Sequence, residues 1–406
     1  RAQSPRSHAG GGMSEAKNAS VLFHRQSVDR LRAAQLLEAR KKHPCSCLIG
    51  CFQGLLSSFS ADSELADNGR SKPPKLEDLA QALPWEQLSE HDRGGVVVAS
   101  CSSSKSVDGW TNQDSAVACV PVCKKVTQDP DTAAMYGDMY GEQGGDAEAE
   151  TAEAPVDVRH ALFGVLDGHG QHGHRVSQLA ASRIPGHLAA QSNFRKDPSK
   201  ALAVAVKKAD ADVYSDMASD VEYNGSTVAL ICLDTKQRVL HCANVGDSRA
   251  VLGRQHGDSW EAVVLTRDIN PDLPEEKERI ERSGGVVSPA RIQGELVGPQ
   301  RVWEDWSLIK PGLAMGRSIG DGCARRVGII PDPDLSKHNL GPNDRFALIA
   351  SDGLWDAVSN EEAVSVAGGH LDKPETALTV LTDMVRQRQD GELEDDTTIV
   401  MIVFKA

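Results

Sequence analysis

The sequence contains no apolar run that approaches the roughly 20 residues a helix needs to cross a lipid bilayer. Aromatic residues make up only 4% of its 406 residues. No cleavable secretory signal is visible, and because the chain begins at Arg1, its true start is left open. Basic residues are outnumbered, with 44 Lys and Arg against 58 Asp and Glu, for a net charge of −14. So acidic a chain is a poor candidate for nucleic-acid binding, and it repels phosphorylated ligands unless bound cations reverse the local field.

Paired cysteine spacing is absent as well. None of the nine cysteines belongs to a Cys-x-x-Cys pair, so neither a zinc site nor a redox function is indicated. We expect reduced thiols in a cytoplasmic or nuclear protein. Cys45, Cys47 and Cys51 follow a basic cluster and resemble a reversible acylation site, whereas the alternative is a small apolar segment that docks on the main domain. Only such acylation would bring the protein to a membrane surface, and we otherwise expect a monomer.

Composition divides the chain near residue 92. Residues 1–92 are predicted to be an N-terminal extension that is partly disordered and contains short helices over about 27–42 and 75–88. Residues 93–406 are predicted to form one globular domain. Within it, about residues 124–156 form an acidic, low-complexity insertion, whose role as a regulatory or a passive segment stays open.

The globular part alternates short apolar runs with turns, which favours a meander of antiparallel strands rather than a βαβ pattern. Strands are predicted over 96–99, 115–120, 162–166, 228–233, 239–245, 250–252, 263–265, 345–350 and 397–404. Helices are predicted over 175–188, 201–217, 274–283, 360–367 and 374–389. Residues 294–311 are predicted to be an irregular loop.

Aspartates recur where the predicted strands meet turns. Asp167-Gly168-His169-Gly170 follows a buried run and brings a carboxylate, a glycine carbonyl and an imidazole together. Each such aspartate alone is explained by its ordinary preference for strand ends. Further cases behind other apolar strands indicate convergence; they are Asp114, Asp247, Asp352 with Asp356, and Asp395 with Asp396. Carboxylates that converge need cations, and oxygen ligands favour Mg²⁺ or Mn²⁺ over zinc.

Six blocks occur in a fixed order along the chain. They are FGVLDGHG at 163–170, GST at 225–227, ANVGDSR at 243–249, LAMGRSIGD at 313–321, ASDGLWD at 350–356 and DDTT at 395–398. Together they closely resemble the metal-dependent serine/threonine protein phosphatases of the type 2C family. The resemblance implies an α+β fold, a sandwich of two antiparallel β-sheets flanked by pairs of α-helices. It makes residues 93–406 the catalytic domain.

The resemblance also implies two Mg²⁺ or Mn²⁺ ions. Asp167 would bridge both ions, Asp352 and Asp395 would complete the shell of one, and the Gly168 carbonyl would serve the other. Two such ions, about 4 Å apart, would hold a bridging hydroxide in line with the phosphorus of phosphoserine or phosphothreonine on a protein substrate.

The remaining predicted site residues also follow from the resemblance. Asp114 would act through bound water, and Asp247 and Asp356 resemble the ligands of a weaker third ion. His169 would donate a proton to the departing oxygen.

The sequence departs from the family at the substrate phosphate. An arginine that many members carry shortly before the Asp114 position is missing, and the stretch from Ser106 to Thr111 has no basic residue. Lys105 and, more remotely, Arg317 are the candidates for this contact. A catalytically weak or silent member that acts as a protein-binding scaffold is the alternative function; Asp167, Asp352 and Asp395 favour the enzyme.

Overall fold

Strands that are mostly apolar form the centre of a six-stranded sheet. All seven residues of β4, β7 and β8 are buried, because one face of the sheet meets a second sheet and the other meets helices. Neighbouring strands pair antiparallel throughout. In spatial order the strands are β1 (Ala82–Pro84), β3 (Ser115–Pro121), β4 (His160–Leu166), β7 (Val228–Asp234), β8 (Val239–Val245) and β15 (Asp334–Asn339).

A five-stranded antiparallel sheet stacks on the first. In spatial order its strands are β10 (Ser259–Val264), β9 (Arg249–His256), β16 (Asp344–Ala350), β17 (Thr397–Phe404) and β2 (Val96–Ser103). Phe163 and Ile231 of the first sheet share a buried core with Ile349 and Val400 of the second. The sandwich expected from the sequence is therefore confirmed.

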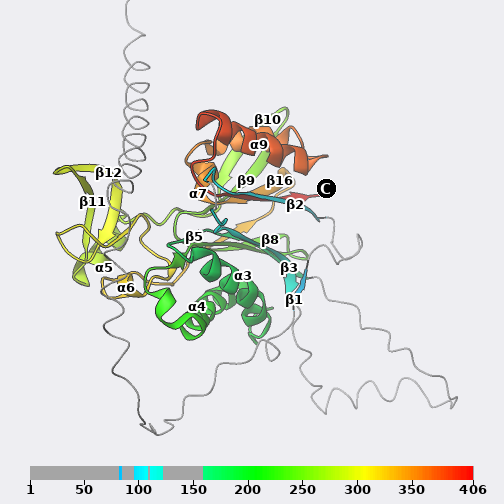
Figure 1. The fold of residues 1–406 in the computed structure, drawn as a ribbon. Coiled ribbons are helices and arrows are strands. Elements are labelled where there is room, and N and C mark those ends of the chain that lie inside the picture. The colour runs from blue at the N-terminus through cyan, green and yellow to red at the C-terminus, as the bar shows by residue number, and fades with distance from the viewer. Residues whose placement is uncertain (1–81, 85–95, 108–109, 122–158, 406) are drawn as a thin grey trace, which may run out of the picture. The chain divides into compact units, whose positions relative to one another are not determined.

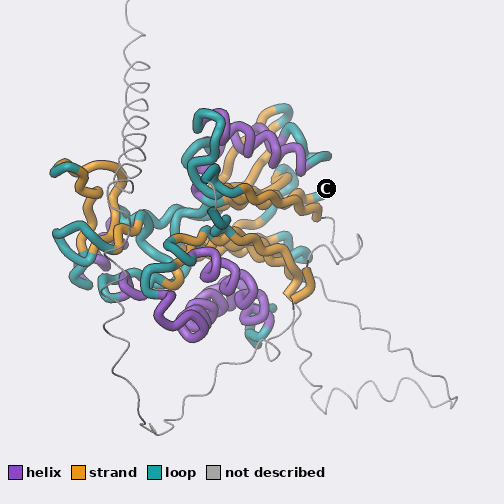
Figure 2. The backbone as a smooth tube through the Cα atoms, in the orientation of Figure 1, coloured by secondary structure: helices purple, strands orange, loops and turns teal. Residues whose placement is uncertain are grey.

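Two pairs of helices cover the outer faces of the sandwich (Figures 1 and 2). Helices α3 (Gly173–Ala189) and α4 (Pro198–Met217) pack on the six-stranded sheet. Helices α8 (Asn360–Gly368) and α9 (Pro374–Arg388) pack on the five-stranded sheet. The shorter helices of the described residues are η3 (Ala218–Val221), α5 (Pro274–Arg282), α6 (Gly322–Arg325) and α7 (Asp352–Trp355).

The prediction of an irregular loop over 294–311 is wrong for residues 295–303 and 311, which lie in strands, and is confirmed for residues 304–310. A separate three-stranded sheet is formed by β11 (Val286–Ile292), β12 (Glu295–Trp303) and β13 (Pro311–Leu313). Most side chains of β12 are exposed or half-buried, and its sequence carries a Gly-Pro pair, so no apolar alternation marks it as a strand. The turn signal is present, because Gln293 and Gly294 both take positive φ as a tight hairpin requires.

The predicted helix over 75–88 is also wrong where the structure describes it, because β1 pairs there with β3. Pro84 lacks the N–H that a helix interior needs. The structure is a computed structural model that describes residues 82–84, 96–107, 110–121 and 159–405, all within the unit Pro73–Ala406. The helix predicted over 27–42, the cysteines Cys45, Cys47 and Cys51, and the acidic insertion lie outside the described residues.

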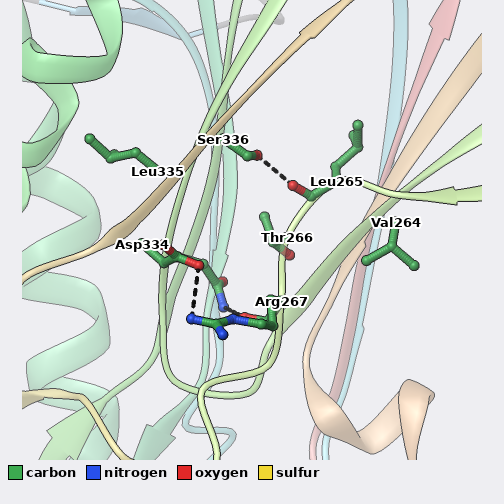
Figure 3. Close-up of a pocket in the computed structure, with 8 residues that line it drawn as sticks. Val264, Leu265, Thr266, Arg267, Asp334, Leu335 and Ser336 are labelled. Atoms are coloured by element: carbon green, nitrogen blue, oxygen red, sulfur yellow. Dashed lines mark hydrogen bonds and ion pairs between the residues drawn. The ribbon is translucent and has the colours of Figure 1, made fainter. Parts of the chain in front are cut away.

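The two large sheets are bridged beside the edge strand β15 (Figure 3). Asp334 of that strand pairs with Arg267 at 3.5 Å, and Ser336 donates a hydrogen bond to the carbonyl of Leu265. Asn244 of β8 donates to the carbonyl of Arg267 at 3.0 Å. The residues that make these contacts line a small pocket, and none of the predicted site residues lines it.

Candidate metal centre and active site

Asp114 and Asp167 lie opposite each other at one end of the six-stranded sheet. Asp167 follows the last residue of β4, and Asp114 precedes the first residue of β3. They meet because Ser115 pairs with Leu166 in the antiparallel ladder. The register of two strands thus brings together carboxylates that are 53 positions apart in the sequence.

The five-stranded sheet contributes Asp352 and Asp395 by the same principle. Asp352 begins α7 just after β16, and Asp395 lies just before β17. The pairing of Ala350 with Ile399 holds these two strand ends side by side. In Figure 1, α7 and β5 (Gly168–His169) lie at the same end of the sandwich, away from the C-terminal end of β17.

The charges of the aspartates show that the two sheets deliver them to one place. Burial raises the pKa of Asp167 well above its ordinary value, and neighbouring negative charges raise it further. Those charges belong to Asp114, Asp352 and Asp395. Burial likewise raises the pKa of Asp352, followed by the charges of Asp247 and Asp395. These aspartates of the two sheets are therefore close enough for their charges to act on one another.

Several oxygens of this cluster have no hydrogen-bond partner although they are buried: Oδ1 of Asp114, of Asp247 and of Asp352. Unsatisfied carboxylate oxygens among like charges are the environment that hard divalent cations stabilise. Among the described residues, no three His, Cys, Asp or Glu side chains stand at the spacing of a single bound ion. Binding of a cation would therefore require these side chains to shift. The donor set fits Mg²⁺ or Mn²⁺.

Thr227, the third residue of the Gly-Ser-Thr block, fixes the backbone at Asp167 by two hydrogen bonds. The Asp167 N–H donates to Thr227 Oγ1 at 2.9 Å, and the Thr227 N–H donates to the Asp167 carbonyl at 2.8 Å. Thr227 Oγ1 also lies 2.6 Å from Oγ of Ser248, the residue after Asp247. One hydroxyl thus links the two loops that carry Asp167 and Asp247.

Gly168 occupies a position that no side chain could share. An added Cβ would lie 2.5 Å from the carbonyl oxygen of Gly173 and 2.6 Å from that of Gln113. The Gly168 N–H donates to this Gln113 carbonyl at 3.2 Å, and the Gln113 side-chain amide donates to the Gly170 carbonyl at 2.8 Å. Gln113 therefore holds the loop on both sides of His169.

Gly168, Gly170 and Gly173 also match the Gly-x-Gly-x-x-Gly pattern of dinucleotide-binding folds. That pattern serves such ligands at a turn between parallel strands. Here β4 pairs antiparallel with β7, the strand that follows the helices. The close packing of Gly168 against Gly173 accounts for both glycines without a nucleotide.

His169 is paired with a residue that the sequence analysis quoted within a block but gave no role. Its Nε2 lies 2.7 Å from Oδ2 of Asp321, which is 2% exposed. Ser318 Oγ donates to the same carboxylate at 2.5 Å. Burial alone lowers the pKa of His169, but the charge and hydrogen bond of Asp321 outweigh it and raise that pKa above 6.5. The aspartate that ends the 313–321 block was the available signal.

Asp247 and Asp356, the residues predicted for a third ion, lie close enough to Asp352 for their charges to act on it. Burial and then the charge of Asp268 raise the pKa of Asp247 to about 6. Asp356 is exposed, and its charge raises the pKa of Asp247 and Asp352. The charges of Asp356 and Asp247 also act on Arg249, but Nε of Arg249 donates to Asp268 at 2.8 Å.

The two candidates for the substrate phosphate differ in their surroundings. Arg317 donates from Nε and Nη2 to Glu276, which is fully buried, and from Nη1 to the carbonyl of Asp332 at 2.7 Å. Its guanidinium is thus engaged in holding α5. Lys105 instead lies near Asp395. Burial raises the pKa of Asp395, and the charge of Lys105 opposes that rise.

Comparisons with known proteins indicate one family. The family model described as protein phosphatase 2C matches residues 143–396, a range that leaves out Asp114. Probable protein phosphatase 2C 64 of Oryza sativa subsp. japonica is 37% identical over 235 residues, which are 56% of this chain and 53% of that protein. Probable protein phosphatase 2C 72 of Arabidopsis thaliana is 34% identical over 260 residues, 60% of this chain and 76% of that protein. The match thus spans about half the length of the rice relative.

Solved structures show the same fold at low identity. The serine-threonine phosphatase 2C from Toxoplasma gondii superposes with a TM-score of 0.60 at 20% identity, over 76% of this chain and 94% of that one. A C. elegans sex determining protein gives 0.54 at 20% identity, over 76% and 65%. With the family model covering more than half of the chain, this protein belongs to the protein phosphatase 2C family of serine/threonine phosphatases.

Proposed function

We propose that this protein is an active phosphatase that hydrolyses phosphoserine and phosphothreonine on proteins and depends on Mg²⁺ or Mn²⁺. The proposal is carried by the convergence of buried carboxylates around Asp167, next to the His169–Asp321 pair. Family membership supplies the substrate class, phosphorylated proteins.

The residues present would hold two ions. Asp167 would contact both, with Asp352 and Asp395 on one side and the Gly168 carbonyl on the other, while Asp114 would act through bound water. When bound, two divalent ions lower the pKa of water and offset charge on phosphoryl oxygens. Asp247 and Asp356 would hold a third, weaker ion.

His169 would supply the proton that the departing serine or threonine oxygen needs. Asp321 keeps the imidazole oriented and favours its protonated form, because its charge and hydrogen bond raise the pKa of His169. Ser318 and the burial of Asp321 fix this carboxylate in turn. The chain's own part in the reaction is thus to bind, orient and deliver one proton.

Hydrolysis of p-nitrophenyl phosphate and of a phosphothreonine peptide tests the proposal. The assay compares Mn²⁺ with a chelator, using the full chain and the variants Asp167→Ala and Asp352→Ala. We expect Mn²⁺-dependent hydrolysis that falls by more than about 100-fold in either variant, since each removes a metal ligand. Asp332→Ala, at a half-exposed aspartate paired with Lys207, is the matched control and should retain activity.

Two results would contradict the enzyme: activity that survives chelation, or activity unchanged in both variants. Binding of Mn²⁺ without hydrolysis of either substrate would favour the scaffold alternative.

We also propose a cytoplasmic or nuclear location. The five described cysteines form no disulfide with one another, which supports a reducing compartment. Within the part of the chain that the structure describes, no helix is long and apolar enough to span a bilayer. Peripheral attachment through Cys45, Cys47 and Cys51, and a monomeric state, stay predictions. Label exchange at thioester-linked acyl groups on these cysteines in cells would test the attachment, and no exchange would end it.

A further inference from the structure

The carboxylate of Asp396 organises the loop that follows β2. Asp396 is 3% exposed, and its carboxylate accepts hydrogen bonds from three N–H donors. The backbone N–H of Lys105 donates at 2.9 Å, the indole N–H of Trp110 at 2.9 Å, and the backbone N–H of Gln113 at 2.8 Å. One buried anion thus fixes both Lys105 and Trp110 relative to β17, the strand that Asp395 precedes.

The Lys105 ammonium lies over the indole ring of Trp110. Nζ of Lys105 lies 3.4 Å from the centroid of the indole ring, the geometry in which a cation is attracted to an aromatic face. The ring cannot turn freely because its N–H is held by Asp396. A lysine side chain is otherwise flexible, so this contact restricts the position of the Lys105 ammonium.

The charge placed in this way lies next to the acidic cluster. The Lys105 backbone N–H and the Trp110 indole N–H both donate to Asp396, the residue after Asp395, a predicted metal ligand. No carboxylate of the described residues forms an ion pair with Lys105, whereas Arg249 is engaged by Asp268 and Arg317 by Glu276. Lys105 is therefore the cation beside the cluster that keeps its donors available for a ligand.

We propose that Lys105 binds the phosphoryl oxygens of the substrate monoester and that Trp110 is its positioning residue, replacing the arginine that this chain lacks. The inference rests on the proposed function and deepens it. A lysine is a point charge with three rotatable donors rather than a planar fork. The planar guanidinium of an arginine has a fixed arrangement of donors, whereas the lysine ammonium does not. Contact with the indole face therefore restricts the position of the ammonium.

The test measures binding of inorganic phosphate to the Mn²⁺-loaded full chain by calorimetry, together with KM and kcat for p-nitrophenyl phosphate. The variants are Lys105→Ala, Lys105→Arg, Trp110→Leu, Trp110→Phe and the double variant Lys105→Ala/Trp110→Leu. Lys208→Ala, at an exposed lysine of α4, is the matched control. Mn²⁺ affinity and thermal melting of every variant show whether the metal site and the fold are kept.

We expect Lys105→Ala to weaken phosphate binding about tenfold and to raise KM similarly, with little change in Mn²⁺ affinity. Trp110→Leu should weaken phosphate binding about threefold, and Trp110→Phe less, because phenylalanine keeps an aromatic face. Both substitutions remove the bond to Asp396, so their difference isolates the ring. The double variant should be no weaker than Lys105→Ala alone, and Lys105→Arg should retain most binding.

Unchanged phosphate binding in Lys105→Ala would overturn the assignment of Lys105. Additive losses in the double variant, or equal losses in Trp110→Leu and Trp110→Phe, would overturn the positioning role of Trp110. Calorimetry needs no turnover, so these outcomes are separate from the failure of the proposed function, which would appear as absent hydrolysis in the unmodified chain.

Discussion

The imidazole Nε2 of His169 and Oδ2 of Asp321 lie 2.7 Å apart, although 152 positions separate them in the sequence. Asp321 is held by Ser318, and its backbone N–H donates to the carbonyl of Asn224 at 2.9 Å. The proton donor predicted from one block thus depends on an aspartate at the end of another.

Replacing Asp321 with asparagine keeps its shape but removes its charge. We expect kcat to fall about tenfold with little change in KM, because the donor loses part of its orientation and protonation. Asp321 raises the pKa of His169, and the protonated donor exists below that pKa, so the variant should lose activity at a lower pH than the parent as pH rises. The kcat–pH profile measures this. An unshifted alkaline limb would contradict the role of Asp321.

The metal site should compete with protons. In the metal-free fold, burial is the largest cause that raises the pKa of Asp114 and of Asp247 to about 6. A carboxyl whose pKa is higher in the folded than in the unfolded chain binds more protons when folded, so its contribution to stability falls as pH rises from about 4 to about 6. Mn²⁺ should therefore raise the Tm more at about pH 7 than at about pH 5.5. Melting curves with and without Mn²⁺ decide, and the reverse order would refute the prediction.

Asp352→Asn should stabilise the metal-free protein. Burial, and then the charges of Asp247 and Asp395, act against an ionised Asp352 and raise its pKa, so its neutral replacement should raise the free energy of unfolding by about 1 kcal/mol at neutral pH. The same variant should gain less from added Mn²⁺. Urea unfolding measures both effects, and a less stable metal-free variant would show that repulsion is not dominant there.

Gly168→Ala should destabilise the fold by about 2–3 kcal/mol. The added methyl group would meet two backbone carbonyls, those of Gly173 and Gln113, and neither can swing aside as a side chain would. Gly341→Ala is the matched control, because its nearest atom, Oδ2 of Asp344, would lie at an ordinary 3.7 Å. Urea unfolding of the two variants should differ clearly, and equal stabilities would be inconsistent with the tight packing at Gly168.

Arg317→Ala should affect stability rather than phosphate binding. It removes the hydrogen bonds to buried Glu276 and leaves Arg279 as that carboxylate's remaining ion-pair partner, so we expect a loss of about 2–3 kcal/mol in unfolding free energy. Phosphate affinity of the folded fraction should stay unchanged. A selective loss of phosphate affinity would instead restore Arg317 as a phosphate ligand.

Strongly patterned segments were predictable from the sequence. Uniformly buried strands such as β4 and β17 are continuous apolar runs, and Asp167 at the end of β4 follows from turn chemistry next to that run. Strand β12 was missed because most of its side chains are exposed or half-buried and show no apolar alternation. The helix predicted across Pro84 was wrong because strand pairing with β3 prevailed over a helical spacing of leucines.

By itself, the sequence determined which chemical groups stand at strand ends, and its six ordered blocks determined the family, because both depend on local order along the chain. Only the tertiary structure decided which of these groups are available to bind a ligand. Glu276 accepts hydrogen bonds from Arg317, Asp321 orients His169, and the ring of Trp110 packs against the Lys105 ammonium. Such pairings depend on how distant segments pack, and no periodicity along the chain encodes that packing.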